Sequence, residues 1–363
     1  MKTRNKIITT LLFACASTMT MMACSHSSKE TAQTNFDTPK VQTSSENSKV
    51  IHLAGGCFWG MEKLAKALPG VIDTTVGYAN GIEDTTPTYK SVCAGGTGFK
   101  ETVRVEYDPE IITLEQIISA FFLAIDPEAV NYQGNDHGTQ YQSGIYYSDD
   151  ESAAIVESIM QQEKKRYKNL AVEHEELTRF YDAENYHQDY LEKNPAGYCH
   201  FSQTMIDQIA GIIQAEQSYA KMSEDDLKNE LSDEQYSVTQ EAGTERPFSG
   251  EYYDTDEEGI YVDITSGQPL FSSKDKYISD CGWPAFTVPI LAGSVNYSGD
   301  TSHNMNRTEV TSANGEAHLG HVFENDPESP NGTRYCINSA SLKFIPKKDM
   351  GEQGYGAYLI LFE

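Results

Sequence analysis

The sequence predicts an α+β protein, in which a mixed α/β domain of two layers precedes a mostly antiparallel β domain. Three observations support this class. The length of 363 residues suits two domains. Helix-like and strand-like periods alternate up to about residue 201, and beyond residue 244 the segments become short, strand-like and separated by turn residues. No repeat relates the two halves, so duplication does not explain them.

The N-terminus predicts export. Basic residues precede an apolar run from Ile7 to Ala16, so we interpret residues 1–24 as a signal peptide and the Ser/Thr/Lys/Gln-rich residues 25–48 as a flexible tether. The end of the signal, Met22-Ala-Cys24-Ser, resembles a bacterial lipoprotein box. It implies a lipid anchor at Cys24 and a place in the periplasm or cell envelope. A cleaved signal with an incidental cysteine is the alternative.

Charge and cysteine content exclude some functions. A formal net charge of −27 makes nucleic acid an unsuitable partner, because phosphate binding needs clustered Lys and Arg. No CxxC pair occurs, which excludes a four-cysteine zinc site and a thioredoxin motif. Beyond the export segment the cysteines are Cys57, Cys93, Cys199, Cys281 and Cys336.

The elements of the first domain, residues 49–201, follow from periodicity and caps. Alternation predicts strands over 50–54, 71–78 and 102–107, and an apolar helical pattern runs from Phe58 to Leu68 before Pro69-Gly70. Capping boxes predict two further helices, and they lie at residues 113–116 and 148–151.

The rest of the chain divides into three parts. Residues 202–243 are helical and acidic, and we interpret them as a linker with little of its own to bury. Residues 244–346 form the β domain, in which Asn314-Gly315 predicts a hairpin turn. Residues 347–363 are a C-terminal tail.

Cys57 is the first candidate nucleophile. It lies at a strand-to-helix turn, where free backbone N–H groups and the helix dipole stabilise a thiolate. The rings of Phe58 and Trp59 beside it suit a substrate with a small apolar group. The alternative interpretation is a structural cysteine in a core helix.

Five motifs in order resemble the A-type peptide-methionine sulfoxide reductases over about residues 50 to 200. They are Gly56-Cys-Phe-Trp-Gly60, Thr88-Tyr89, Gly98-Phe-Lys-Glu101-Thr-Val-Arg-Val, Gly134-Asn-Asp-His-Gly-Thr-Gln-Tyr141 and Asn194-Pro-Ala-Gly-Tyr-Cys199.

That resemblance implies a role for each matched residue. Cys57 attacks the sulfoxide sulfur, Glu101 protonates the leaving oxygen, and Cys199 captures the sulfenic acid as a disulfide. Tyr89 and Tyr141 hydrogen-bond the oxygen, Asp136 supports the site, and Phe58 and Trp59 hold the methyl group. A buried carboxyl with a raised pKa suits the acid role. We expect Cys93 to be buried and structural.

The second candidate site lies on a strand near the C-terminus. Alternation along residues 334–338 puts Arg334, Cys336 and Asn338 on one face. His318 and His321 could supply acid chemistry to that thiol. Two histidines with Cys281 and Cys336 could equally hold zinc, so a metal site remains open at this point.

Three motifs resemble the B-type methionine sulfoxide reductases over about residues 244 to 346: Cys281-Gly-Trp-Pro-Ala-Phe286, His318-Leu-Gly-His321-Val-Phe and Arg334-Tyr-Cys336-Ile-Asn338-Ser. The resemblance implies Cys336 as nucleophile, Cys281 as resolving thiol and His321 as acid. It places His318, Arg334 and Asn338 around the substrate and makes Trp283 a wall of the methyl pocket.

One departure concerns metal. Many B-type relatives carry two CxxC pairs that bind structural zinc, and the matching positions here are Asp263 with Ser266 and Ser312 with Gly315. We therefore expect no zinc and no bound cofactor.

The two resemblances together imply a bifunctional enzyme that reduces both epimers of methionine sulfoxide in oxidised proteins. Because no CxxC module lies in the chain, an external thioredoxin-like dithiol must supply electrons. Two alternatives remain: a thiol peroxidase-like redox protein, and a zinc-binding surface lipoprotein.

Overall fold

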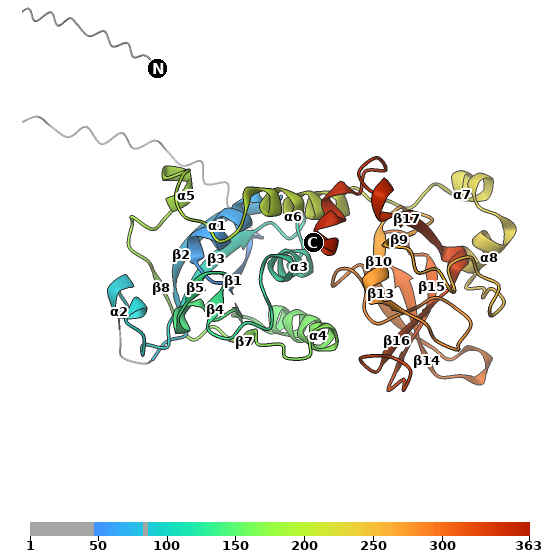
Figure 1. Ribbon diagram of the computed structural model, residues 1–363, viewed down its shortest axis with the longest axis horizontal. Helices are drawn as coiled ribbons and strands as arrows, with labels where there is room; N and C mark the ends of the chain where they lie inside the picture. The colour runs from blue at the N-terminus through green and yellow to red at the C-terminus, as the bar shows by residue number, and fades with distance from the viewer. Residues whose placement is uncertain (1–46, 83–85) are drawn as a thin grey trace, which may run out of the picture. The chain divides into compact units, whose positions relative to one another are not determined.

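The computed structural model describes residues 47–82 and 86–363 (Figure 1). The predicted signal peptide with Cys24, and all but the last two residues of the predicted tether, lie outside the described residues. Within the part of the chain that is described, every helix is too short or too polar to cross a membrane.

The first domain is built on a six-stranded sheet with the order β7-β6-β1-β3-β2-β8, in which only β6 and β7 pair in parallel. Its elements are β1 Lys49–Ala54, α1 Phe58–Ala67, β2 Val71–Ala79, α2 Tyr89–Cys93, β3 Lys100–Tyr107, α3 Leu114–Ala124, β4 Tyr132–Gln133, β5 Asp136–His137, η1 Thr139–Tyr141, β6 Gly144–Tyr147, α4 Asp150–Arg166, β7 Glu173–Glu176, β8 Phe180–Asp182 and α5 Tyr190–Lys193.

Most of the predicted elements of this domain are confirmed within two residues. The capping box at Thr113 and Gln116 forms as expected, because each side chain bonds the other's backbone N–H. The box expected at Ser148 is wrong by one residue. Asp149 is the N-cap of α4, and its carboxylate accepts from Ser152 N at 2.8 Å.

Three helices follow, namely α6 Gln203–Glu216, α7 Glu224–Glu230 and α8 Asp233–Glu241. The expectation that this segment has little to bury is wrong for α6. Ile206, Ile209, Ile212 and Ile213 are all at most 1% exposed, and α6 packs on α1 and α3 (Figure 1). Their spacing makes one apolar stripe, so α6 belongs to the core of the first domain.

The second domain is antiparallel β throughout its described pairings. One sheet has the order β10-β9-β17 and the other β11-β12-β16-β15-β14-β13, which confirms the predicted fold class. The elements are β9 Gly259–Asp263, β10 Pro269–Ser272, η2 Ser273–Asp275, β11 Lys276–Tyr277, β12 Ala285–Phe286, β13 Val295–Asp300, η3 Ser302–Asn304, β14 Arg307–Ser312, β15 His318–Glu324, β16 Thr333–Ile337, η4 Ser339–Ser341 and β17 Leu342–Pro346.

The C-terminal tail is ordered as two 3-10 helices, η5 Lys347–Asp349 and η6 Gly356–Phe362. The segment η6 packs against α6. There the Tyr358 hydroxyl donates to the buried Glu216 carboxyl at 2.6 Å, and Gln268 of the second domain donates to the same carboxyl at 2.9 Å. One buried acid thus joins α6, the tail and the second domain.

Candidate active sites

Cys57 is the N-cap residue of α1, as predicted, and only 6% of its surface is exposed. The backbone N–H groups of Trp59 and Gly60 lower the pKa of its thiol, as the helix start predicts. Burial outweighs them. Together with the nearby Glu101 carboxyl, burial raises the pKa of the Cys57 thiol well above its ordinary value. The resting site therefore holds a protonated thiol, not the stabilised thiolate that the sequence suggested.

Glu101 lies on β3 beside this helix start and is 1% exposed. Its Oε2 accepts a hydrogen bond from the Phe58 N–H at 3.2 Å, while its buried Oε1 has no partner among the described residues. Burial raises the pKa of the Glu101 carboxyl to about 8. At neutral pH the carboxyl is mostly protonated, so it can donate a proton to a leaving oxygen.

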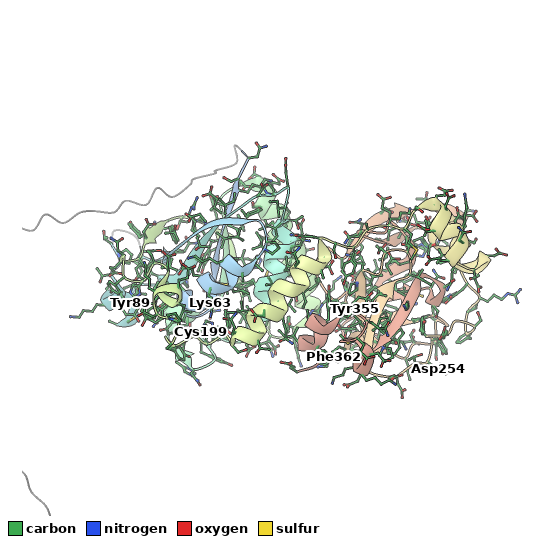
Figure 2. The ribbon with its side chains drawn as sticks, turned by 90° about the horizontal axis from the view of Figure 1, so that it is seen from above. Lys63, Tyr89, Cys199, Asp254, Tyr355 and Phe362 are labelled. Carbon is green, nitrogen blue, oxygen red and sulfur yellow. The ribbon has the colours of Figure 1, made fainter. Side chains whose placement is uncertain are left out.

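Cys199 lies in the loop between α5 and α6, beside Lys63 of α1 (Figure 2). A Cβ atom placed on Gly60 would come within 3.3 Å of Cys199 Sγ and 2.7 Å of the neighbouring His200 ring. Glycine at position 60 therefore lets the loop approach the turn of α1 that carries Cys57. Both thiols are free.

The indole of Trp59 is fixed by two residues that the sequence analysis missed. It stacks on Tyr190 with 3.8 Å between ring centroids, and its Nε1–H donates to His187 Nδ1 at 3.2 Å. His187 also lies against the Phe58 ring, at 5.1 Å between centroids. Nothing in the local sequence marks His187, which follows Trp59 by 128 positions and meets it only in the fold.

Tyr141 and Tyr89 border the same site. Burial, and then the nearby Glu101 and Cys57, raise the pKa of the Tyr141 hydroxyl. Burial, and then the Cys93 thiol, raise the pKa of Tyr89. Both hydroxyls therefore keep their protons and can donate hydrogen bonds.

Cys93 is exposed, so the expectation of a buried structural cysteine is wrong. The residue ends the short helix α2, whose buried position is taken by Val92 at 1% exposure.

The second site is built by strand register. His321 of β15 pairs directly with Cys336 of β16, so the two side chains lie on one face of the sheet. Along β16 burial alternates as predicted, with Tyr335 and Ile337 in the core and Arg334 and Cys336 partly exposed.

The two cysteines of this site lie close together. Cys336 Sγ and Cys281 Sγ are 3.7 Å apart, and the Cys336 thiol donates to the Cys281 sulfur. That hydrogen bond lowers the pKa of Cys281 and raises that of Cys336. The Arg334 guanidinium lowers the pKa of both thiols and lies over the Phe323 ring at 4.6 Å. A disulfide bond is about 2.05 Å long, so a small approach would join the sulfurs.

Each histidine of the second site bonds a carboxylate. His321 Nε2 lies 2.8 Å from Asp300 Oδ2, and His318 Nδ1 lies 2.6 Å from Glu309 Oε1. The pKa of Asp300 is lowered, chiefly by hydrogen bonds from Ser302, so Asp300 is an ionised acceptor and His321 carries its proton on Nε2. Burial lowers the pKa of His321, so the imidazole ring is neutral. Its Nδ1 then has a free lone pair that can accept a proton and pass it on.

A cavity of about 90 Å³ lies over Cys336, and its walls include Trp283, His321 and Asn338. The Trp283 indole N–H donates to the Glu245 carbonyl at 3.2 Å, which fixes the ring. The Asn338 side chain donates to the Leu319 carbonyl and accepts from the Glu245 N–H, so its predicted polar support is mainly to the backbone.

The four positions that match the zinc cysteines of relatives meet at one carboxylate. Asp263 is fully buried, and its Oδ2 accepts from the hydroxyls of Ser266 and Ser312, each at 2.7 Å. A Cβ atom on Gly315 would lie only 1.9 Å from the same oxygen. Gly315 has ordinary φ, and the left-handed residue of this hairpin is Glu316. The glycine is therefore needed for space beside Asp263.

The structure does not gather the ligands of the alternative zinc site. Among the described residues, the metal-ligating atoms of three side chains lie within 4.8 Å of one another only at Cys57, Asp136 and His200. His318 and His321 instead bond Glu309 and Asp300.

Known families match both domains. Residues 49–225 match the model of the peptide methionine sulfoxide reductase family, and residues 231–346 match that of the SelR domain. Reduced Mxr1 of Saccharomyces cerevisiae is 40% identical over 43% of this chain and 91% of its own, with a TM-score of 0.41. Methionine sulfoxide reductase A of Corynebacterium diphtheriae is 37% identical over 43% of this chain and 79% of its own, with a TM-score of 0.40.

Mxr1 has also been solved in complex with Trx2, and in that structure it is 28% identical over 42% of this chain and 91% of its own, with a TM-score of 0.30. The two family models follow each other along the chain and together take in both cysteine sites. The chain belongs to the peptide methionine sulfoxide reductases, as a fusion of an A-type domain that acts on the (S)-sulfoxide with a B-type domain that acts on the (R)-sulfoxide.

Proposed function

We propose that each domain reduces its sulfoxide through a cysteine sulfenic acid and an intramolecular disulfide, and that the chain thereby repairs oxidised proteins in the cell envelope. The observation that carries this proposal is the pairing of a buried thiol with a buried carboxyl whose pKa is about 8. A protonated acid beside a nucleophile is what cleavage of a sulfoxide S–O bond requires.

In the first domain the Cys57 sulfur attacks the sulfoxide sulfur, and Glu101 gives its proton to the oxygen and recovers one from the thiol. The S–O bond breaks, the hydroxyl passes to Cys57 as sulfenic acid, and the substrate leaves as the thioether. The Cys199 thiol then attacks the sulfenic sulfur, which forms the disulfide and releases water.

The second domain follows the same sequence with Cys336 as nucleophile and Cys281 as resolving thiol. His321 acts through Nδ1, since its Nε2 is held by Asp300: Nδ1 takes the proton of the Cys336 thiol and passes it to the sulfoxide oxygen. Trp283 bounds the methyl group over Cys336, inside the cavity of about 90 Å³.

Each turnover leaves a disulfide, and the chain has no CxxC module to reopen it. We propose that an external thioredoxin-like dithiol supplies two electrons to each domain. We also propose export and a lipid anchor at Cys24, on the basis of the N-terminal sequence.

For the second domain we propose that the Asp263 hydrogen-bond cluster does the structural work of the zinc ion of its relatives. The cluster joins the turn after β9 to the hairpin between β14 and β15 through Ser266 and Ser312. Gly315, at the position of a zinc-binding cysteine in relatives, packs so closely on Asp263 that a Cβ atom there would lie 1.9 Å from Oδ2, which supports this proposal.

Replacing each nucleophile by serine separates the two activities. Cys57→Ser should lower reduction of the (S)-epimer by about three orders of magnitude or more and leave the (R)-epimer unaffected, and Cys336→Ser should do the reverse. The measurement is reduction of each epimer of a blocked methionine sulfoxide with dithiothreitol. Cys93→Ser is the matched control and should keep both activities. Loss of both activities from one change, or consumption of peroxide without reduction of either epimer, would contradict the proposal.

Glu101→Gln should stabilise the protein while lowering (S)-epimer reduction by about 10²- to 10⁴-fold. Burial raises the carboxyl's pKa from 4.5 to about 8, so the stability of the wild type that is present below pH 4.5 is lost as the pH rises toward 8. The uncharged glutamine avoids that loss, which amounts to about 4 kcal/mol at pH 8. The measurement is urea unfolding of both proteins between pH 4.5 and 8.

Glu106→Gln, on the same strand, is the control with the opposite sign. Hydrogen bonds from Arg104 and Ser48 lower the pKa of Glu106, so its removal should cost stability at neutral pH. A Glu101→Gln variant whose stability relative to wild type does not change with pH would refute the raised pKa.

Asp263→Asn should destabilise the second domain by about 1 to 3 kcal/mol, because the hydroxyls of Ser266 and Ser312 lose a shared acceptor or face an amide N–H. Thermal unfolding of the full chain measures this effect, with exposed Asp256→Asn as control. A chelator should leave the melting temperature and (R)-epimer reduction of the wild type unchanged. Loss of either on chelation would show that the second domain needs a metal.

Cys24→Ser should move the exported protein from the membrane fraction to the soluble fraction, because it removes the proposed site of lipidation. Cys15→Ser, in the apolar core of the signal, should leave the protein with the membrane. Cell fractionation with detection of the chain measures both. Equal distribution of the Cys24→Ser variant and the wild type would refute the anchor.

A further inference from the structure

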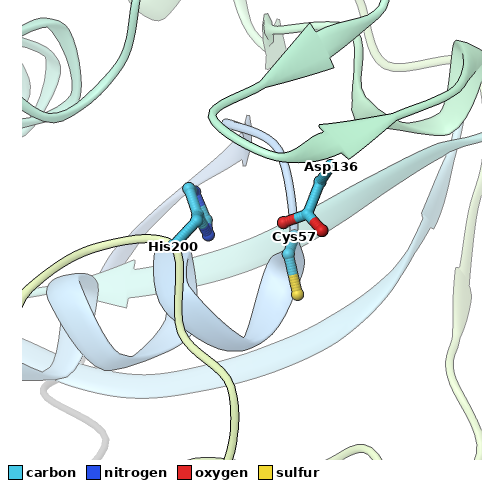
Figure 3. A group of neighbouring side chains, drawn as sticks. All are labelled: Cys57, Asp136 and His200. Carbon is cyan, nitrogen blue, oxygen red and sulfur yellow. The ribbon is translucent and has the colours of Figure 1, made fainter.

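Three side chains with different metal-binding atoms converge at the mouth of the first site (Figure 3). Cys57 Sγ, a carboxylate oxygen of Asp136 and a ring nitrogen of His200 all lie within 4.8 Å of one another. They come from the N-cap of α1, from β5 and from the loop before α6, so only the tertiary fold brings them together.

Two of these side chains have unsatisfied atoms. His200 Nδ1 and Asp136 Oδ2 are buried and lack a hydrogen-bond partner among the described residues. His200 Nε2 lies 3.1 Å from the Gly55 carbonyl oxygen, which can only accept, so Nε2 carries the ring proton. The lone pair of Nδ1 is therefore free. Histidines that bind a metal through one ring nitrogen usually donate the N–H of the other to a carbonyl or carboxylate oxygen, as His200 does here.

The ligand types select the ion. One sulfur, one imidazole nitrogen and one carboxylate oxygen suit zinc and its neighbours, whereas magnesium and calcium prefer sites made of oxygen alone. In a tetrahedral zinc site, bond lengths of about 2.0 to 2.3 Å put ligand atoms about 3.3 to 3.7 Å apart. The three ligand atoms, which lie within 4.8 Å of one another, would approach by about 1 Å to reach these separations.

We propose that the reduced first site binds a zinc-class divalent cation through Cys57, Asp136 and His200, and that the bound ion blocks the site. On binding, the Cys57 thiol releases its proton and its sulfur bonds the metal, with no change of oxidation state. Coordination lowers the nucleophilicity of the sulfur and puts the metal where the sulfoxide would have to approach. Formation of the Cys57–Cys199 disulfide removes the sulfur ligand, so the metal binds and inhibits only the reduced enzyme. The metal has no part in catalysis.

The blocking effect rests on the proposed role of Cys57, but binding itself does not, so the two are measured separately. The test uses the full mature chain with Cys281→Ser and Cys336→Ser, which removes the thiol pair of the second domain as a competing ligand. The protein is kept reduced with a phosphine, because dithiothreitol binds zinc itself. Titration calorimetry with Zn²⁺ gives affinity and stoichiometry, and Co²⁺ absorption reports a sulfur-to-metal bond.

The expected result is one ion per chain, with a sulfur-to-cobalt band that Cys57→Ser abolishes. Asp136→Asn and His200→Gln should each weaken binding at least about tenfold. His137→Gln is the matched control, because this exposed histidine is adjacent to Asp136 on β5 and should leave the affinity unchanged. Unfolding curves establish that each variant is folded.

Stoichiometric Zn²⁺ should also suppress (S)-epimer reduction in the otherwise unmodified chain, spare (R)-epimer reduction, and lose its effect when a chelator is added. Binding that is absent, or that neither Asp136→Asn nor His200→Gln weakens, would overturn the inference while leaving the reductase function intact. Binding as expected in a chain that reduces neither epimer would instead refute the proposed function and leave the metal site standing.

Discussion

Burial of one carboxyl group determines how the first site works. Glu101 lies under the start of α1 with a single hydrogen bond from the Phe58 N–H, and burial keeps its proton on at neutral pH. The same burial raises the pKa of the Cys57 thiol. Both groups therefore rest uncharged in an apolar pocket, and charge appears there only as protons move with the reacting atoms. With 1% of its surface exposed, the Glu101 side chain has little contact with the water that would favour its ionised form.

The second site controls the protonation of its reactive groups in a different way. Its two sulfurs already lie 3.7 Å apart, and the hydrogen bond between them lowers the pKa of Cys281 and raises that of Cys336. Its proposed acid is a histidine whose tautomer is fixed by an ionised aspartate. The first domain relies on an apolar environment, and the second on hydrogen-bonded pairs of side chains around the central strands β15 and β16. The two domains thus reach similar chemistry through unrelated folds.

The sequence predicted what local pattern determines. Cys57 at a helix start, the alternating face of β16 and the fold class all follow from short stretches of chain. It did not predict contacts made by distant residues, such as His187 with Trp59 or His200 with Gly55. It also missed burial that depends on neighbours. The isoleucines of α6 looked like part of a linker because the surface that covers them comes from α1 and α3.

The Glu216 carboxyl connects the C-terminal segment η6 to α6, a helix that is synthesised much earlier. The Tyr358 hydroxyl reaches this carboxyl across 142 positions, and Gln268 reaches it from the second domain. Synthesis runs from the N-terminus, so α6 is made more than a hundred residues before the segment that covers it. The first domain must therefore hold α6 partly uncovered until translation ends. A chain truncated before Tyr358 would keep the cysteines of both sites, but it would leave the Glu216 carboxyl uncovered and with the Gln268 hydrogen bond alone.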